Sequence, residues 1–228
     1  MLLGRQLMRR ESKTAKIGIV AGGPAELLAD LSEYQIDFWI GCDRGALYLI
    51  NNHLPLDLAI GDFDSVSSHE RELIEQKAKT FIQHPVEKDE TDLELAINEA
   101  LKRPVCELFL FGVTGGRKDH ELSSLFLLER LIDQQIKVKL IDKQNSLSMY
   151  RPGRYHLKRL NHDQKVSFLS LTSLVTGLTL ENFYYPLEDE TIRRGDSLTI
   201  SNHLIAETGY FSFDSGILIV IKTSERNA

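Results

Sequence analysis

The chain has 228 residues, enough for one large domain or two small ones, and 42% of them are apolar, which is usual for a protein with a sizeable core. Its 27 Lys and Arg against 33 Asp and Glu give a net charge of −6, which argues against non-specific nucleic-acid binding. No apolar run approaches the roughly 18 residues of a membrane helix, and two cysteines are too few for a disulfide framework. We therefore expect a soluble, cytoplasmic protein that binds neither nucleic acid nor membrane.

The first fifteen residues are predicted to be a flexible leader. They contain Arg and Ser but lack the continuous apolar core of a secretory signal. We leave residues 1–15 out of the fold prediction, which begins at Lys16.

From Lys16 to about Asp142, short apolar runs alternate with segments of helical periodicity. The runs predicted as strands are Ile17–Ala21, Phe38–Cys42, Leu58–Gly61, Thr80–Ile82, Glu107–Phe111 and Val138–Ile141. Helical spacing is clear in Leu93–Leu101 and Leu122–Ile132. Alternating strands and helices favour right-handed crossovers and a mainly parallel sheet with helices on both faces. Residues 16–144 are predicted to form an α/β, Rossmann-like domain.

After Asn145 the pattern changes to short strands separated by turn residues. The predicted strands are Tyr155–Leu157, Lys165–Leu171, Leu178–Leu180, Ser197–Ser201, Ala206–Phe213 and Ile217–Ile221. Such spacing is typical of an antiparallel sandwich. Residues 145–228 are therefore predicted to be an all-β sandwich domain, with the boundary between Asp142 and Gly153, where Arg151-Pro-Gly153 signals a turn.

Acidic residues gather where the predicted parallel strands end. Asp43 follows the second strand and Asp62 and Asp64 follow the third, while the fourth and fifth lead into residues 87–92 and 112–120. Loops at the carboxyl ends of parallel strands meet at one edge of the sheet, where ligands bind. Many acids at one edge repel one another unless a cation lies between them, and oxygen ligands favour Mg²⁺.

Several of these residues also have a purely structural interpretation. Thr91 and Glu94 match a capping box, Ser67 and Glu70 match a second one, and Asp119 is a possible helix N-cap. Capping needs only one acid, so the two carboxylates that flank Phe63 favour metal binding.

Two glycine-rich loops are candidate phosphate-binding segments. Gly22 and Gly23 permit close approach of a nucleotide, or form a plain turn before Pro24. Gly115-Gly116-Arg117 combines backbone N–H groups at a helix start with a guanidinium that binds phosphate oxygens in pairs. The chain lacks both the P-loop and the dinucleotide fingerprint, so any ATP site has another architecture.

Together these motifs resemble the bacterial thiamine pyrophosphokinases (thiamine diphosphokinases). The residues that carry the resemblance are Gly41–Ala46, Gly61–Ser65, Lys88–Asp92, Gly112–His120, Thr176–Leu180, Tyr184–Leu187 and Ser201-Asn202. It extends in order from about Lys16 to Lys222.

The resemblance implies transfer of the pyrophosphoryl group of ATP to thiamine, giving AMP and thiamine diphosphate, in a homodimer with active sites between subunits. It implies that Asp62, Asp64 and Asp92 hold Mg²⁺. The implied nucleotide and substrate residues are Asp43, Thr91, Arg117, Asp119 and His120. From the residues themselves, Gly22, Gly23 and Lys88 are further candidates for the ATP site. Tyr185, Ser201 and Asn202 are implied to contact thiamine.

The chemistry fits these residues, because positioning and charge neutralisation dominate phosphoryl-type transfers. Arg117 and Lys88 are expected to offset charge on the transferred group, and Asp89 or Asp119 to orient the thiamine hydroxyl or accept its proton. Two other functions use the same residues: a Mg²⁺-dependent nucleotide or diphosphate phosphohydrolase, and a sensor that binds nucleotide or thiamine without turnover. In a third interpretation, the sandwich of residues 145–228 only mediates dimerisation and binds no substrate.

Overall fold

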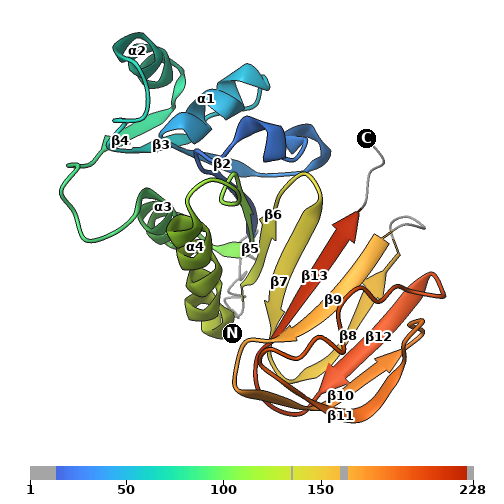
Figure 1. Cartoon of the computed structure of the whole chain (residues 1–228). Coiled ribbons are helices and arrows are strands. Elements are labelled where there is room, and N and C mark those ends of the chain that lie inside the picture. The colour runs from blue at the N-terminus through green and yellow to red at the C-terminus, as the bar shows by residue number, and fades with distance from the viewer. Residues whose placement is uncertain (1–13, 135, 160–163, 225–228) are drawn as a thin grey trace, which may run out of the picture.

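The computed structural model describes residues 14–134, 136–159 and 164–224, and shows an α/β half joined to a β half (Figure 1). Residues 1–13 of the expected leader lie outside the described part, and Ala15 already belongs to the first strand. The first half contains β1 (Ala15–Val20), β2 (Phe38–Cys42), β3 (Leu58–Gly61), β4 (Thr80–Gln83), β5 (Val105–Phe111), β6 (Lys137–Ile141), α1 (Arg44–Asn51), α2 (Ser68–Lys77), α3 (Asp92–Leu101) and α4 (Lys118–Leu131). Short 3-10 helices are η1 (Ala25–Leu27), η2 (Leu31–Glu33) and η3 (Ile132–Gln134).

The second half consists of strands joined by loops. They are β7 (Asn145–Tyr150), β8 (Gly153–Lys158), β9 (Gln164–Ser170), β10 (Leu174–Glu181), β11 (Leu187–Arg193), β12 (Thr208–Phe213) and β13 (Leu218–Ser224). Within the described residues no helix has the length and apolar character to cross a membrane.

One large sheet runs through both halves, in the order β4-β3-β2-β1-β5-β6-β7-β13-β9. The six strands from β4 to β6 are parallel, and antiparallel pairing begins where β7 joins β6. The sheet therefore continues across residues 144 and 145, the predicted division between two domains. The polypeptide turns back sharply there, because the Asp142 carboxylate accepts hydrogen bonds from the backbone N–H groups of Gln144 and Asn145.

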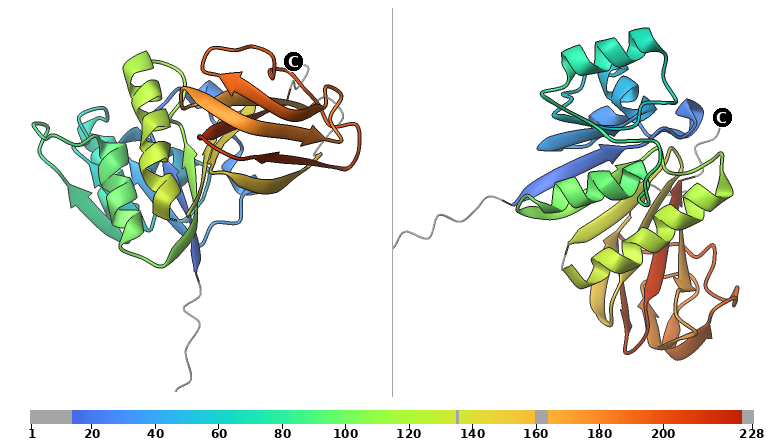
Figure 2. Two further views of the ribbon diagram at one scale, coloured as in Figure 1. Left: turned by 90° about the horizontal axis from the view of Figure 1, so that it is seen from below. Right: turned by 90° about the vertical axis from the view of Figure 1, so that its left-hand side faces the viewer.

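Helices cover both faces of the parallel strands (Figure 2). On one face, Ala96 and Ile97 of α3 and Leu128 of α4 are buried against β1, β2 and β5. On the other face, Leu49 of α1 and Ile74 of α2 pack in a second core. This arrangement confirms the predicted mainly parallel α/β sheet with helices on both faces.

The β half is a sandwich whose two layers have different origins. One layer is the β7-β13-β9 end of the large sheet, and the other is a four-stranded antiparallel sheet in the order β11-β10-β12-β8. Phe168 of β9, Phe183 after β10 and Phe211 of β12 lie within a common core, with Phe168 5.4 Å from each of the other two rings. The predicted sandwich is confirmed.

The predicted strand Ser197–Ser201 is wrong, because these residues form turns. Thr199 is buried and its hydroxyl donates to the Phe168 carbonyl, whereas Leu198 and Ile200 are exposed, so the apolar residues that suggested a strand point outward. Strands β7 and β11 were not predicted. Strand β11 is exposed apart from Ile192 and Leu187, so it lacks the alternating apolar residues on which the prediction relied.

Candidate active site

A cavity of 1120 Å³ opens at the carboxyl ends of the parallel strands. Its walls come from the loops after β1, β2, β3, β4 and β5, as the predicted topology requires. Predicted site residues that line it are Gly22, Gly23, Asp43, Asp62, Lys88, Thr91, Asp92, Arg117, Asp119 and His120.

Three half-buried carboxylates converge within this cavity. Oxygen atoms of Asp43, Asp62 and Asp92 all lie within 4.8 Å of one another. They come from the end of β2, the end of β3 and the first residue of α3. We call these three residues the acidic cluster. Sequence reasoning placed Asp43 at the nucleotide and missed its position beside the other two acids.

The backbone turns the Asp43 side chain into the cluster. Asp43 has a φ of 45°, and its carboxylate makes no hydrogen bond that caps α1. Instead, its Oδ1 accepts the Phe63 N–H at 2.9 Å. Gly61 leaves room for this carboxylate, because a Cβ at that position would lie 2.0 Å from Asp43 Oδ1. Burial raises the pKa of Asp43 to about 7, and the nearby carboxylates of Asp92 and Asp62 add to the rise.

Lys88 supplies a positive charge beside two members of the acidic cluster, Asp62 and Asp92. Its Nζ lies 3.1 Å from Asp62 Oδ2 and 2.9 Å from Asp92 Oδ1, and its side chain is 12% exposed. Burial by itself lowers the pKa of Lys88, but pairing with Asp92 and Asp62 outweighs it and the pKa is raised. At Asp62, burial alone would raise the pKa. The hydrogen bond from the Asp64 N–H and the pairing with Lys88 outweigh burial, so the pKa of Asp62 is lowered.

Asp64 and Asp89 lie further out than the acidic cluster. Asp64 is exposed and its N–H donates to Asp62 Oδ1 at 3.1 Å; the adjacent Asp62 charge raises the pKa of Asp64. Asp89 is exposed on the β4–α3 loop and does not line the cavity. The structure thus brings together one residue of the Asp62–Asp64 pair and leaves the other at the surface.

The helix starts near the site show which structural interpretations hold. Thr91 is the N-cap of α3 and its Oγ1 accepts the Glu94 N–H at 3.2 Å, but the Glu94 carboxylate pairs with Arg130 and does not close a capping box. The Ser67–Glu70 capping box is complete. Thr91 therefore orients the helix whose first residue, Asp92, belongs to the acidic cluster.

The glycine loops bring two backbone segments into contact. Gly23 donates its N–H to the Gly112 carbonyl at 2.8 Å, and a Cβ on Gly23 would lie 2.5 Å from that oxygen. Tyr48 fixes the same loop, because its hydroxyl donates to the Gly23 carbonyl at 2.9 Å. Gly115 and Gly116 have φ values of 76° and 79°. The Gly115 N–H donates to the Glu121 carboxylate.

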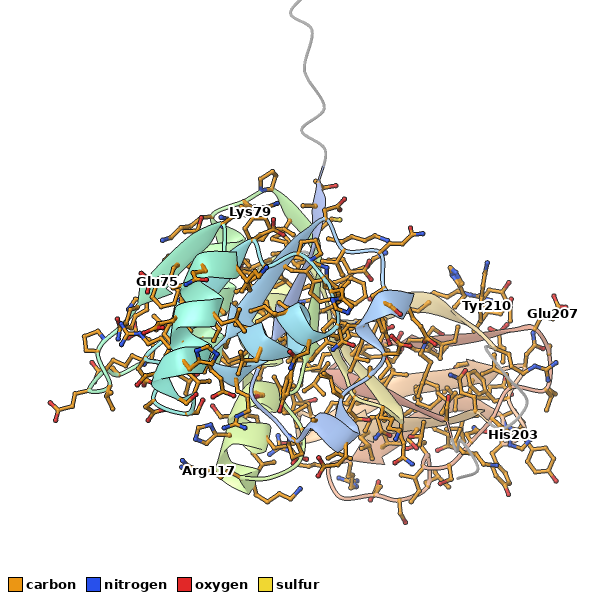
Figure 3. All side chains as sticks on the ribbon, turned by 90° about the horizontal axis from the view of Figure 1, so that it is seen from above. Glu75, Lys79, Arg117, His203, Glu207 and Tyr210 are labelled. Atoms are coloured by element: carbon orange, nitrogen blue, oxygen red, sulfur yellow. The ribbon has the colours of Figure 1, made fainter. Side chains whose placement is uncertain are left out.

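Arg117, labelled in Figure 3, forms an exposed ion pair with Asp119, and both residues line the cavity. The Asp119 carboxylate accepts from Arg117 Nη2 at 2.7 Å and from Nε at 3.2 Å. This pairing with Arg117 lowers the pKa of Asp119 to about 2. Arg117 is the N-cap residue of α4, so the interpretation of Asp119 as N-cap is wrong: Asp119 lies inside the first turn and its carboxylate is held by the guanidinium.

The predicted thiamine residues lie on the sandwich, away from the acidic cluster. Asn202 is buried, and its side chain holds the Tyr185 backbone: Oδ1 accepts the Tyr185 N–H at 3.0 Å and Nδ2 donates to the Tyr185 carbonyl at 2.8 Å. Tyr185 and Tyr184 are exposed, and Tyr184 stacks on His203. Ser201 is exposed and donates its N–H to the Ser167 hydroxyl. Figure 3 shows His203 far from Arg117.

Several residues of the cavity wall were not predicted. Tyr48 and Arg44 are on α1, and Arg44 Nη2 donates to the Ser65 carbonyl at 2.6 Å. Ser123 and Ser124 line the cavity from α4. The sequence signal was the position of Arg44, directly after Asp43 at a strand end. Tyr48 and Ser123 lie within helices, where periodicity alone does not mark them.

Comparison with known proteins covers both halves of the chain. A family described as "Thiamin pyrophosphokinase, catalytic domain" matches residues 31–140, and one described as "Thiamin pyrophosphokinase, vitamin B1 binding domain" matches residues 154–218. Thiamine pyrophosphokinase from Bacillus subtilis (strain 168) is 41% identical over 211 residues, covering 92% of this chain and 99% of the relative.

Solved structures of thiamine pyrophosphokinases superpose on this chain over nearly its whole length. The crystal structure of thiamine pyrophosphokinase from Bacillus subtilis gives a TM-score of 0.87 at 41% identity, covering 92% of this chain and 99% of that one. The structure of thiamin pyrophosphokinase from Geobacillus thermodenitrificans gives 0.84 at 38% identity, covering 93% and 99%.

Proposed function

Because the chain belongs to the thiamine pyrophosphokinase family, we propose that its acidic cluster binds a divalent cation together with the phosphates of ATP. The chain is a thiamine diphosphokinase, which transfers a pyrophosphoryl group to the hydroxyl of thiamine. The observation that carries the cation proposal is the convergence of Asp43, Asp62 and Asp92 within 4.8 Å at one end of the cavity.

The residues fit a hard cation such as Mg²⁺. All three members of the cluster offer carboxylate oxygens, which Mg²⁺ prefers. Asp92 Oδ1 is buried and receives no hydrogen bond within the described residues, although the Lys88 ammonium is near. We propose Asp62, Asp64 and Asp92 as ligands, as the resemblance implies, and Asp43 as a further carboxylate ligand, since its oxygen lies within 4.8 Å of those of Asp62 and Asp92. A bound Mg²⁺ would neutralise charge on the phosphates.

The chain's own residues complete the nucleotide site. Gly22 and Gly23 keep the first loop close to Gly112 and leave space beside the backbone for phosphate. Arg117 offers a planar guanidinium at the rim and exchanges its pairing with Asp119 for phosphate oxygens. Thr91 and His120 line the same wall.

Asp119 is the acid best placed to meet the thiamine hydroxyl. It lines the cavity, whereas Asp89 does not. When Arg117 turns to phosphate, Asp119 loses the partner that lowers its pKa. Its carboxylate is then free to orient the attacking hydroxyl and to accept its proton.

We place the thiamine contacts on Tyr185, Ser201 and Asn202 of the sandwich, and propose a cytoplasmic homodimer whose active sites lie between subunits. In one chain this end of the sandwich lies far from the rim residue Arg117 (Figure 3), so a second subunit is needed to bring thiamine to the acids. The exposed Tyr185 ring suits stacking on a cationic heterocycle. A transferase needs a binding site for the acceptor, thiamine, whereas a phosphohydrolase does not. A sensor would bind thiamine without turnover.

Replacement of one carboxylate tests the proposal. Asp62→Asn should retain the native circular dichroism spectrum and lose activity by about 100-fold or more in an end-point assay with ATP, Mg²⁺ and thiamine. The wild type should form AMP and thiamine diphosphate in equal amounts. Glu75→Gln, on the exposed side of α2, is the matched control. Full activity of Asp62→Asn would refute the cation site, and nucleotide loss that ignores thiamine would favour the hydrolase.

A further inference from the structure

Lys88 pairs with two of the three carboxylates that could hold a cation in the acidic cluster. Its ammonium group lies among three oxygens, Asp92 Oδ1 at 2.9 Å, Asp62 Oδ2 at 3.1 Å and the Pro85 carbonyl at 3.2 Å. The Lys88 and Asp62 side chains are 12% and 10% exposed. A divalent cation on the same carboxylates would therefore meet a nearly buried positive charge at close range.

Between Pro85 and Glu90, the Lys88 side chain ties the segment to the acidic cluster. Residues 84–91 connect β4 to α3 without helix or strand, and the neighbours of Lys88 from Pro85 to Thr91 are exposed. A loop with few buried contacts can shift at a small cost in free energy. Lys88 is thus able to leave Asp62 and Asp92 for another partner without disturbing the core.

We propose that Lys88 is an internal counter-ion: it holds Asp62 and Asp92 together in the metal-free enzyme and yields them only when a divalent cation and a polyphosphate bind together. This rests on the cation site proposed above. A cation that bound alone would have to displace Lys88 and leave its ammonium without a carboxylate partner, so binding of the cation alone is weak. A nucleotide brings phosphate oxygens that pair with the displaced ammonium, so each ligand assists the other. Lys88 is in this sense a positioning residue that couples the two binding events.

The coupling between cation binding and nucleotide binding is measured by isothermal titration calorimetry. Mn²⁺ is titrated into metal-free protein with and without α,β-methylene-ATP. In wild type, Mn²⁺ alone should bind weakly, and α,β-methylene-ATP should strongly increase the affinity for Mn²⁺. Lys88→Met should bind Mn²⁺ alone about tenfold more tightly and show a coupling several-fold smaller. Lys88→Arg keeps the charge and should stay close to wild type. Lys102→Met, which breaks the exposed Lys102–Glu99 pair at the other end of α3, is the control.

A second readout separates this role from simple stabilisation of the fold. Without metal, Lys88→Met should melt at a lower temperature than wild type, because Asp62 and Asp92 then lack their counter-ion. Saturating Mn²⁺ should raise the melting temperature of Lys88→Met more than that of wild type. A structural role alone predicts the same Mn²⁺-induced rise in both proteins and would refute the inference.

Asp62→Asn in the same titration separates the two proposals. If Asp62→Asn abolishes Mn²⁺ binding while Lys88→Met binds Mn²⁺ no more tightly than wild type, the counter-ion role is wrong and the cation site stands. If Asp62→Asn binds Mn²⁺ as wild type does, the cation site is wrong and the counter-ion role falls with it.

Discussion

Removal of the Asn202 side chain should loosen the segment that presents Tyr185. In the native structure the Asn202 side chain makes three hydrogen bonds to backbone: with the Tyr185 N–H, with the Tyr185 carbonyl and with the His203 N–H, at 3.0, 2.8 and 2.9 Å. A neutral hydrogen bond contributes about 1 kcal/mol, so Asn202→Ala should lower the free energy of unfolding by about 2–3 kcal/mol. For a chain of this length the melting temperature should fall by about 4–12 °C.

Urea unfolding and steady-state kinetics together test this reasoning. Because Asn202 positions Tyr185, the KM for thiamine should rise while the KM for ATP stays unchanged. Asn52→Ala is the control, since the exposed Asn52 side chain makes one hydrogen bond, to the Tyr48 carbonyl at 2.8 Å, and should cost about 1 kcal/mol or less. A loss for Asn202→Ala no larger than that of the control would refute the reasoning. A raised KM for thiamine with unchanged stability would leave Asn202 as the direct thiamine contact proposed above and would refute its role in positioning Tyr185.

Two further predictions concern the electrostatics and the packing of the site. Burial raises the pKa of Asp43 from 3.8 to about 7, so the folded state holds this proton more tightly than the unfolded chain. The Asp43 contribution to stability is therefore complete below pH 4 and lost as the pH rises through 7. In urea unfolding with a chelator, the stability of wild type relative to Asp43→Asn should fall between pH 4 and pH 8, and a constant difference would contradict the assignment. Gly45→Ala places a Cβ 1.9 Å from the Val20 carbonyl oxygen and should cost about 1–3 kcal/mol in urea unfolding, whereas Gly22→Ala, with no contact under 3.4 Å, should cost less; equal losses would contradict the clash.

The parallel half of the sheet was predictable because most of its strands are buried, although the edge strand β4 is partly exposed. Runs such as Leu58–Gly61 and Glu107–Phe111 are apolar enough to be recognised from sequence, and the structure places β3 and β5 there. Strand β11 contains Glu188, Asp189 and Glu190 at a solvent-exposed edge, so no apolar alternation marks it. The pairing of β6 with β7 depends on a turn at residues 142–145, and it extends one sheet through both halves.

The edge of the sheet that carries the site was predictable, but the grouping of its side chains was not. Strand order and direction bring Asp43, Asp62 and Asp92 to one edge, and that follows from topology. Which carboxylates meet depends on backbone angles within single turns. Asp64 follows Asp62 by two residues and is exposed, while Asp43, nineteen positions before Asp62, completes the cluster. The Lys88–Asp92 motif marked Lys88 as a candidate site residue, but only the fold shows that it lies between Asp62 and Asp92.

The aromatic residue between Asp62 and Asp64 explains how the chain holds like charges together. Phe63 is buried and stacks on Phe81 of β4, with ring centroids 4.6 Å apart. This anchor holds Phe63 at a φ of 59°, which is costly for a bulky residue, and it presents the Phe63 N–H to Asp43. Core packing thus opposes both the backbone strain of the turn and the repulsion between Asp43 and Asp62. The acids are therefore already close together before any cation arrives, and the free energy of binding a cation is not spent on gathering them.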